Sequence, residues 1–374
     1  MSGRRPKPMS DHDALLRAIC ENPADDLPRL VFADWLEENG QPDRAQFIRT
    51  EVDLYRRPEW DAERARYEHA ARAESAWPDR RPWLGECPDG PVSGIAWSGE
   101  PVVRRGFPWC VKAANLESLS YLWDHFADRW PVEQVDFETA DHLLRLARTP
   151  ILRRLTGLAF RGARLSARVV PAFANDPAVG HLEALTFWGG SLSPAGVTAL
   201  LESPLFVNLA ALGVNDHATG VGLALLEGVE QYQPGPRFRA LELRTARLGD
   251  DGFRLLAAAE SLSGLTHLNL QGNHVNADRA GLLAESPTFA GLRVLLLAAN
   301  PLGNAGAAAL ARPGCLPELR VLDLSFCQVG DDGVRAVLDS PLADRLVLLN
   351  LAGSPASDET KQALRERMGD RVRL

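Results

Sequence analysis

The sequence predicts an α/β solenoid, in which a curved sheet of parallel strands lies inside and helices lie outside, preceded by a small all-helical module. Three observations predict this fold class. A leucine pattern recurs every 27 residues, a second apolar pattern at helical spacing keeps the same period, and the N-terminal segment is helical in pattern without that repeat. A fixed period of this length is typical of stacked units that each contribute one strand and one helix.

The leucine pattern has the form Leu-x-x-Leu-x-Leu and defines eight clear units. Successive sets lie 27 residues apart, except for one interval of 29 where residues 231–236 interrupt the pattern. The eight sets are Leu155, Leu158 and Phe160; Leu182, Leu185 and Phe187; Leu209, Leu212 and Val214; Phe238, Leu241 and Leu243; Leu265, Leu268 and Leu270; Leu292, Leu295 and Leu297; Leu319, Leu322 and Leu324; and Leu346, Leu349 and Leu351. A ninth set, Val132, Val135 and Phe137, precedes them by only 23 residues and predicts an atypical first repeat.

Each unit is expected to begin with its strand, because the alternating leucines place their side chains on one face. A helix then returns the chain to the next strand, and its apolar face keeps the period at Leu256, Leu283, Leu310, Val337 and Leu364. We expect Asp250 and Asp331 to cap two of these helices. Three residues after the last leucine of four units stand Asn273, Asn300, Cys327 and Ser354, whose side chains can satisfy backbone groups where the chain leaves the strand.

The N-terminal part is patterned as short helices. Apolar residues at helical spacing follow Asp11, Pro28 stands where the first turn of a second helix is expected, and Asn39 and Gly40 supply a stop. The segment from Val102 to Leu146 mixes strand-like and helix-like patterns, and we interpret it as the solenoid's N-terminal cap. The expected organisation is a flexible tail at 1–9, a helical module at 10–77, a proline- and glycine-rich connector at 78–101, and the solenoid with its cap at 102–374.

Composition limits the possible functions. The chain has 374 residues, 45% of them hydrophobic and 24% charged, as in an ordinary soluble globular protein. No apolar run reaches the roughly 20 residues that span a bilayer, so we expect a cytoplasmic protein. The net charge is −8, with most of the excess negative charge in residues 1–100, and this balance argues against a nucleic-acid partner. The five scattered cysteines predict neither disulfides nor a zinc site.

These patterns resemble a known family. Residues 130–374 are similar to leucine-rich repeats of the ribonuclease-inhibitor-like type, and the segment from Pro28 to Val52 resembles the bacterial repeat-companion domain that precedes such arrays. The runs Arg104 to Phe107 and Leu364 to Leu374 resemble the junction and the end of such proteins. The resemblance implies a leucine-rich-repeat solenoid from a bacterium, and it carries no established activity. The inhibitor itself is far richer in cysteine than this chain.

No catalytic chemistry is evident in the sequence. Phosphate-loop, zinc-helix, serine-elbow and dinucleotide-binding motifs are all missing from it, so we predict no enzyme, no catalytic residues, no cofactor and no metal. Asp25, Asp26 and Asp34 cluster in the sequence, but helix caps and solvated faces explain them. His267 shares a strand face with polar neighbours, yet a lone histidine rarely ligates a metal.

The candidate binding residues lie between the buried leucines and are expected to project from the concave sheet face. They are Asp136, Glu138, Arg161, Trp188, Asn215, Asp216, Glu242, Arg244, His267, Asn269, Gln271, Asp323, Ser325, Phe326 and Asn350. Trp188 and Phe326 have the composition of interface anchors, although simple exposure explains them equally well. We therefore predict a non-catalytic protein-protein interaction scaffold. The alternatives are an acidic inhibitor or regulator of a basic enzyme such as a nuclease, and an unrecognised hydrolase or transferase if side chains of distant repeats converge.

Overall fold

The computed structural model describes residues 10–58, 61, 63–64, 95–126, 129–139, 143–161, 168–189, 192–215, 220–235 and 237–374. The chain forms two compact units. The first comprises Met1–Glu59 and Tyr67–Phe137, and the second comprises Trp60–Arg66 and Glu138–Leu374. Among the described residues, no helix has both the length and the apolar character that crossing a membrane requires.

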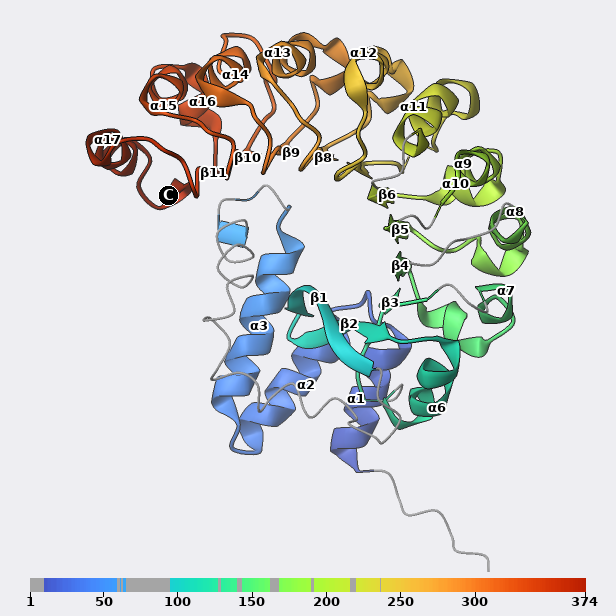
Figure 1. The fold of residues 1–374 in the computed structure, drawn as a ribbon. Helices are drawn as coiled ribbons and strands as arrows, with labels where there is room; N and C mark the ends of the chain where they lie inside the picture. Colours follow the sequence, from blue (N-terminus) through green and yellow to red (C-terminus); the bar gives the residue numbers. More distant parts are fainter. Residues whose placement is uncertain are drawn as a thin grey trace, which may run out of the picture. The chain divides into compact units, whose positions relative to one another are not determined.

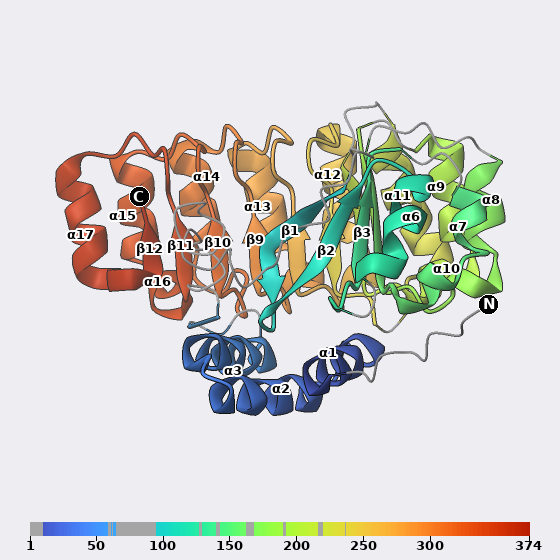
Figure 2. The same cartoon turned by 90° about the horizontal axis from the view of Figure 1, so that it is seen from below.

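The first unit begins with three helices, α1 (Asp11–Glu21), α2 (Leu27–Glu38) and α3 (Pro42–Arg56). The Ser10 hydroxyl accepts a hydrogen bond from the Asp13 amide and caps α1. Proline stands in the first turn of both α2 and α3, where the missing N–H costs nothing. Helix α2 packs against both of its neighbours (Figure 2).

A β-hairpin follows the helices within the same unit. Strand β1 (Ile95–Arg104) begins inside the range expected to be a connector, and it pairs antiparallel with β2 (Phe107–Ala113). Arg105 and Gly106 link them with φ of 53° and 83°, which are the two left-handed residues of a tight hairpin turn. Helix α6 (Leu116–Phe126) then leads to β3 (Gln134–Phe137), which lies parallel to β2. The sequence pattern left this segment ambiguous.

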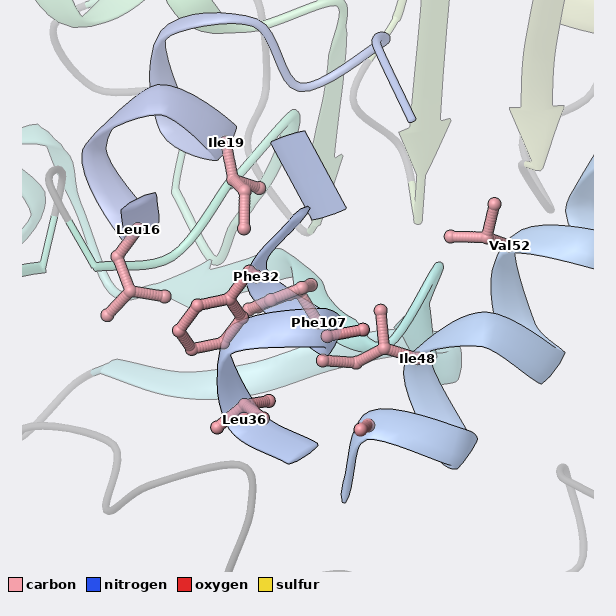
Figure 3. Packing of buried hydrophobic residues seen from close by; sticks show 9 residues of the cluster. Leu16, Ile19, Phe32, Leu36, Ile48, Val52 and Phe107 are labelled. Atoms are coloured by element: carbon pink, nitrogen blue, oxygen red, sulfur yellow. The ribbon is translucent and has the colours of Figure 1, made fainter. Parts of the chain in front are cut away.

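The hairpin and the helices share one core. Phe107 of β2 is buried against Phe32 of α2, with ring centroids 6.0 Å apart, and it packs in the same cluster as Ile19 and Ile48 (Figure 3). The Arg105 guanidinium donates to the Ala24 carbonyl in the α1–α2 connection at 3.0 Å. The sequence analysis placed the hairpin in the solenoid cap, and in the structure its Phe107 packs with the N-terminal helices.

The second unit contains nine described strands in chain order, each parallel to the next. Figure 1 shows that these strands form a curved sheet on the inner side of the unit and that the helices lie on its outer side. They are β4 (Gly157–Arg161), β5 (Ala184–Trp188), β6 (Ala211–Asn215), β7 (Ala240–Glu242), β8 (His267–Asn269), β9 (Val294–Leu296), β10 (Val321–Asp323), β11 (Leu348–Asn350) and β12 (Val372–Arg373).

Helices and 3-10 turns connect these strands. The α-helices are α7 (Leu143–Leu146), α8 (Val169–Ala174), α9 (Pro194–Leu201), α10 (Pro204–Asn208), α11 (Val221–Tyr232), α12 (Gly249–Ala258), α13 (Ala277–Glu285), α14 (Gly303–Leu310), α15 (Asp331–Leu338), α16 (Pro341–Arg345) and α17 (Asp358–Met368). The 3-10 turns are Pro150–Arg154, Pro177–Val179, Glu260–Leu262, Pro287–Phe289 and Gly369–Arg371.

The strand register follows the leucine pattern. Leu241, Leu268, Leu295, Leu322 and Leu349 pair with one another across β7 to β11, and each of them is 1% exposed or less. Because a slip of one residue would turn every leucine out of the core, the pattern fixes the register. The predicted solenoid arrangement of strands and helices is therefore confirmed at the level of a mostly parallel sheet with stacked helices.

The expected helix caps are wrong in detail. Asp250 and Asp331 lie inside the first turns of α12 and α15 and make no capping bond to their own helices. The Asp331 carboxylate accepts a hydrogen bond from the Ser357 amide at 2.7 Å, and that bond holds the pKa of Asp331 below its usual value. Asp250 pairs with Arg279 at 2.8 Å. Both acids therefore tie one repeat to the next, because parallel repeats bring equivalent turns side by side.

A ladder of buried polar side chains joins consecutive repeats. Asn273 and Asn300 donate to the carbonyl oxygens of Leu243 and Leu270 of the preceding unit. Cys327 occupies the equivalent position, and its Sγ donates to the Leu297 carbonyl at 3.0 Å. Burial raises the pKa of this thiol to about 11, which keeps it protonated. The prediction that these positions satisfy backbone groups is confirmed.

Candidate interaction surface

The sheet of the second unit has a face that the buried leucines leave open, and the residues between them line it. Residues in register form rows across the strands, because each parallel strand presents equivalent positions side by side. One row consists of Arg161, Trp188 and Asn215 on β4, β5 and β6. Arg244 continues this row, because it lies two residues after Glu242, which pairs with Gly213 of β6.

Trp188 brings two arginines together in this row. The guanidinium carbon of Arg161 lies 4.9 Å from the indole centroid, and that of Arg244 lies 5.1 Å from the same centroid. Both distances are within the range in which a cation is attracted to the face of an aromatic ring. Trp188 is half-buried and Arg161 is exposed. We call these three residues the Arg–Trp–Arg cluster.

Asn215 lies buried in the same row and fixes the position of Arg244. Its Oδ1 accepts a hydrogen bond from the Arg244 backbone amide at 2.9 Å, and its Nδ2 donates to Glu242 Oε2 at 3.3 Å. Only 3% of Asn215 is exposed, so it is a positioning residue and not a contact residue. The sequence placed it on the open face and did not show this role.

Three further candidates turn back onto their own backbone. The side-chain oxygens of Asn269, Asp323 and Asn350 each accept a hydrogen bond from the amide two residues later, at 3.1, 2.8 and 3.1 Å. Asp323 also accepts from the hydroxyl of Ser325, which is buried. These short side chains therefore hold the turns that end their strands, as aspartate and asparagine commonly do.

The C-terminal strands carry an apolar patch on the same face. Val321 and Leu348 pack together with Val294 in a small cluster of their own. Only 9% of Val321 and 7% of Leu348 is exposed, so neighbouring side chains already cover much of this patch.

Phe326 follows β10 and is 66% exposed. It occupies the left-handed region with φ of 56°, and the equivalent positions in other repeats, Thr245, Gly272, Ala299 and Gly353, all have positive φ as well. The Phe326 ring packs over Gly353, where a Cβ would lie 2.5 Å from the ring. A bulky residue in this backbone conformation costs free energy, about 1 kcal/mol or more.

The remaining candidates differ in burial and in the unit to which they belong. Asp136 is 3% exposed on β3 of the first unit. Glu138 is exposed at the start of the second unit, and Asp216 lies outside the described residues. His267 is half-buried, with Nδ1 2.9 Å from the Thr266 hydroxyl, and Gln271 is half-buried after β8.

Two acids of the N-terminal cluster, Asp26 and Asp34, form ion pairs within the first unit. Asp26 pairs with Arg56 at 3.0 Å and with Arg105 at 3.5 Å, and Asp34 pairs with Arg49 at 2.6 Å. In the part of the chain that the structure describes, no three His, Cys, Asp or Glu side chains are grouped so that they could hold a metal ion. These carboxylates neutralise neighbouring arginines.

A buried arginine also belongs to this structural network, and the sequence pattern did not reveal it. Arg29 is 1% exposed, and burial lowers its pKa to about 10. Its Nη1 donates to the Asp25 carbonyl at 2.9 Å, and its Nη2 lies 4.0 Å from a Glu133 carboxylate oxygen. A buried guanidinium needs hydrogen-bond and ion-pair partners, because an uncompensated buried charge is strongly destabilising.

The comparison with protein-family models agrees with the repeat architecture. A leucine-rich-repeat family model matches residues 316–338. A search of curated proteins returned no matching sequence.

Solved structures of low similarity were also found. The yeast structure of a Rad7 and Elc1 complex is 15% identical, with a TM-score of 0.41, and the match covers 65% of this chain and 67% of that one. A Bacteroides fragilis protein solved by a structural genomics consortium is 14% identical, with a TM-score of 0.36, and the match covers 67% and 78%. The 27-residue register, the strand-and-helix units and the family match together support a leucine-rich-repeat protein.

Proposed function

We propose that this chain is a non-catalytic scaffold that binds another protein on the open sheet face of its second unit. The observation that carries the proposal is Phe326, a large aromatic side chain that is two-thirds exposed in a backbone conformation better suited to glycine. Folding alone favours neither feature, because exposure gains no burial energy and the positive φ costs free energy. Contact with a partner would compensate both.

Trp188 supplies a second anchor on the same open face. Aromatic and arginine side chains contribute disproportionately to protein-protein interfaces, and Trp188 is contacted by two arginines. Asn269, Asp323 and Asn350 have short polar side chains, which suit the rim of an interface more than its anchors.

The finer assignment also belongs to this proposal. We infer that the repeats are of the ribonuclease-inhibitor-like type, because a full helix follows most of the strands. We also infer that the three-helix core of the first unit is a repeat-companion module. The hairpin supports this inference, since the Arg104 to Phe107 run packs onto those helices: Arg104 lies over the Tyr55 ring at 5.5 Å and Phe107 is buried among them.

A pull-down with the full chain as bait tests the proposal. Proteins captured from the native cell by crosslinking are compared for the wild type and for Phe326→Gly and Trp188→Ala. Glycine adopts φ of 56° without strain, so Phe326→Gly should fold at least as stably as the wild type. Leu282→Ala is the control, because Leu282 is also exposed but lies on the helix α13.

The expected result is that the two face variants lose a partner that the wild type and Leu282→Ala both retain. Thermal unfolding of each variant checks that the loss is not a folding defect. If both face variants capture the same proteins as the wild type, the open sheet face is not the binding surface.

A further inference from the structure

We propose that the outward face of helix α2 is a docking surface for a basic amphipathic helix of another protein. This inference concerns the first unit and does not depend on the sheet face of the second unit. Three observations carry it: two exposed apolar side chains one helical turn apart, an excess of acids along the same helix, and the position of those acids at its C-terminal end.

One stripe of α2 faces away from the core. An α-helix has about 3.6 residues per turn, so positions 27, 31, 34 and 38 fall along one line on its surface. These positions hold Leu27, Val31, Asp34 and Glu38, all of them exposed. Phe32 and Leu36 lie on the opposite side of the helix, within the buried core (Figure 3). We call the four exposed residues the α2 stripe.

The neighbouring helices contact the flanks of α2 and leave the stripe open. The rings of His12 on α1 and Trp35 have centroids 5.4 Å apart, and Arg49 on α3 pairs with Glu37 at 2.6 Å. The two apolar side chains of the stripe are nevertheless 63% and 44% exposed. Within the described part of the chain, no other helix carries two exposed large apolar side chains. Such a pair differs from the single apolar residues that are scattered over most protein surfaces.

Acids at the C-terminal end of α2 outnumber the bases that pair with them. Arg49 Nη2 lies 2.6 Å from a carboxylate oxygen of Asp34 and 2.6 Å from one of Glu37, so two acids share one cation. Glu38 is exposed and forms no ion pair within the described residues. Arg44 lies over a buried aromatic ring on the core side of α2. The exposed side of this helix end is therefore negative.

The placement of Glu37 and Glu38 adds to this negative charge. Both lie in the last turn of α2, which contains no basic residue. The C-terminal end of a helix carries a partial negative charge, so acids are unfavourable there and a cation is favourable. Folding alone does not favour this arrangement, whereas a cationic partner would stabilise it.

A basic amphipathic helix matches both the apolar and the acidic part of the α2 stripe. Helix α2 has 12 residues, and at a rise of about 1.5 Å per residue the stripe runs straight for about three turns. A second helix can lie along such a stripe and bury Leu27 and Val31 beneath its apolar face. Its lysine or arginine side chains would then pair with Glu38 and with the acids that share Arg49.

The same charges disfavour other occupants. If α2 packed against α2 of a second copy, a parallel arrangement would place Glu38 against Glu38, and the two carboxylates would repel each other. An antiparallel arrangement would place Glu38 against Leu27 and remove the carboxylate from water without a cation. An anionic membrane or a nucleic acid would also meet carboxylates where it requires cations.

Fluorescence anisotropy of labelled peptides with the full chain tests the proposal. The probe is a peptide of about fourteen leucine and lysine residues, with the leucines at helical spacing. Its controls are a peptide of the same composition, reordered so that the leucines share no face, and the matching leucine-glutamate peptide. The variants are Leu27→Ala and Glu38→Lys. Their matched controls are Leu282→Ala, which is exposed on α13, and Asp339→Lys, which changes an exposed acid at the C-terminal end of α15.

We expect the leucine-lysine peptide to bind the wild type and both control variants. Leu27→Ala and Glu38→Lys should each weaken binding by about fivefold or more, and added salt should weaken binding as well. Neither variant should melt below the wild type, because Leu27 is exposed and the helix dipole favours a lysine at position 38. Failure of the peptide to bind the wild type, equal affinity for the reordered peptide, or equal binding by all variants would each overturn the proposal.

Two further measurements distinguish this surface from other sites and occupants. Phe326→Gly should bind the peptide as well as the wild type does, because Phe326 belongs to the second unit. If Phe326→Gly loses the peptide and Leu27→Ala retains it, the peptide binds the sheet face and the proposal is wrong. Sedimentation of the full chain should show no dimer that Leu27→Ala abolishes. Such a dimer would make a second copy the occupant and would also overturn the proposal.

Discussion

Replacing Asn300 by alanine should destabilise the second unit severely, because this side chain satisfies buried backbone groups in two repeats. Its Oδ1 accepts hydrogen bonds from the amides of Asn273 and Val275 at 2.8 and 2.9 Å. Its Nδ2 donates to the carbonyls of Leu270 and Leu297 at 3.1 and 2.7 Å. Only 1% of Asn300 is exposed, so water does not replace these bonds.

The expected magnitude follows from the two amides. Alanine leaves both of these buried N–H groups without an acceptor, and each orphaned group costs about 1–3 kcal/mol. The carbonyls lose less, because Leu297 still accepts from the Cys327 thiol. We therefore expect the free energy of unfolding to fall by about 4 kcal/mol, a large share of the roughly 5–15 kcal/mol typical of a protein domain.

Urea unfolding of the full chain, followed by circular dichroism, measures this loss. Native-state hydrogen exchange should also show faster exchange at the Asn273 and Val275 amides than in the wild type. Asn208→Ala is the control, since Asn208 is exposed and should change stability by less than about 0.5 kcal/mol. A loss below about 1 kcal/mol for Asn300→Ala would refute the inference that the Asn300 side chain satisfies buried backbone groups.

Three other perturbations test the same physical account. Leu324→Asp buries an unpaired carboxylate at a site 1% exposed and should cost several kcal/mol, whereas Leu282→Asp on an exposed surface should melt close to the wild type. Gly106→Ala places a Cβ 3.0 Å from a backbone carbon of α3 and should lower the melting temperature more than Gly40→Ala, which has a similar φ of 78° and open space around it. The Cys327 thiol has a pKa of about 11 in the folded protein and a lower pKa in the unfolded chain. The stability that the neutral thiol contributes is therefore fully present below about pH 8.5 and is lost as the pH rises toward 11. Urea unfolding at pH 8 and 10.5 should therefore show a larger loss for the wild type than for Cys327→Ser, by about 2 kcal/mol, and parallel losses would contradict this assignment.

The strand register was predictable because one physical pattern determines it. The leucine triplets report which face of each strand is buried, and a period of 27 residues leaves a single alignment of neighbours. Leu268 and Leu295 therefore pair as the sequence indicates. The first unit was harder to predict, because Phe107 belongs to a hairpin whose partner core residues, such as Phe32, lie far away in sequence. No short-range pattern indicates that packing.

Helix caps and turn conformations were harder to predict from the sequence than the strand register. Aspartate at the start of a helix is expected to accept hydrogen bonds from the amides of its own helix. Asp331 instead accepts one from the Ser357 amide in the following repeat. The repeated left-handed position was also hidden, because Thr245, Ala299 and Phe326 occupy it without the glycine that normally marks it. Backbone strain of this kind is visible only in the dihedral angles.

The candidate surface was predicted as a set of positions, and the structure divides that set by role. Asn269, Asp323 and Asn350 satisfy the turns of their own strands, so exchanging them should affect stability before binding. Arg161 and Arg244 instead meet at Trp188 from strands that are not adjacent. Because 83 residues of sequence separate these arginines, no local motif could reveal their shared contact. Repeat proteins bring such distant side chains into one row, and for this reason their recognition chemistry has to be sought across repeats and not within one.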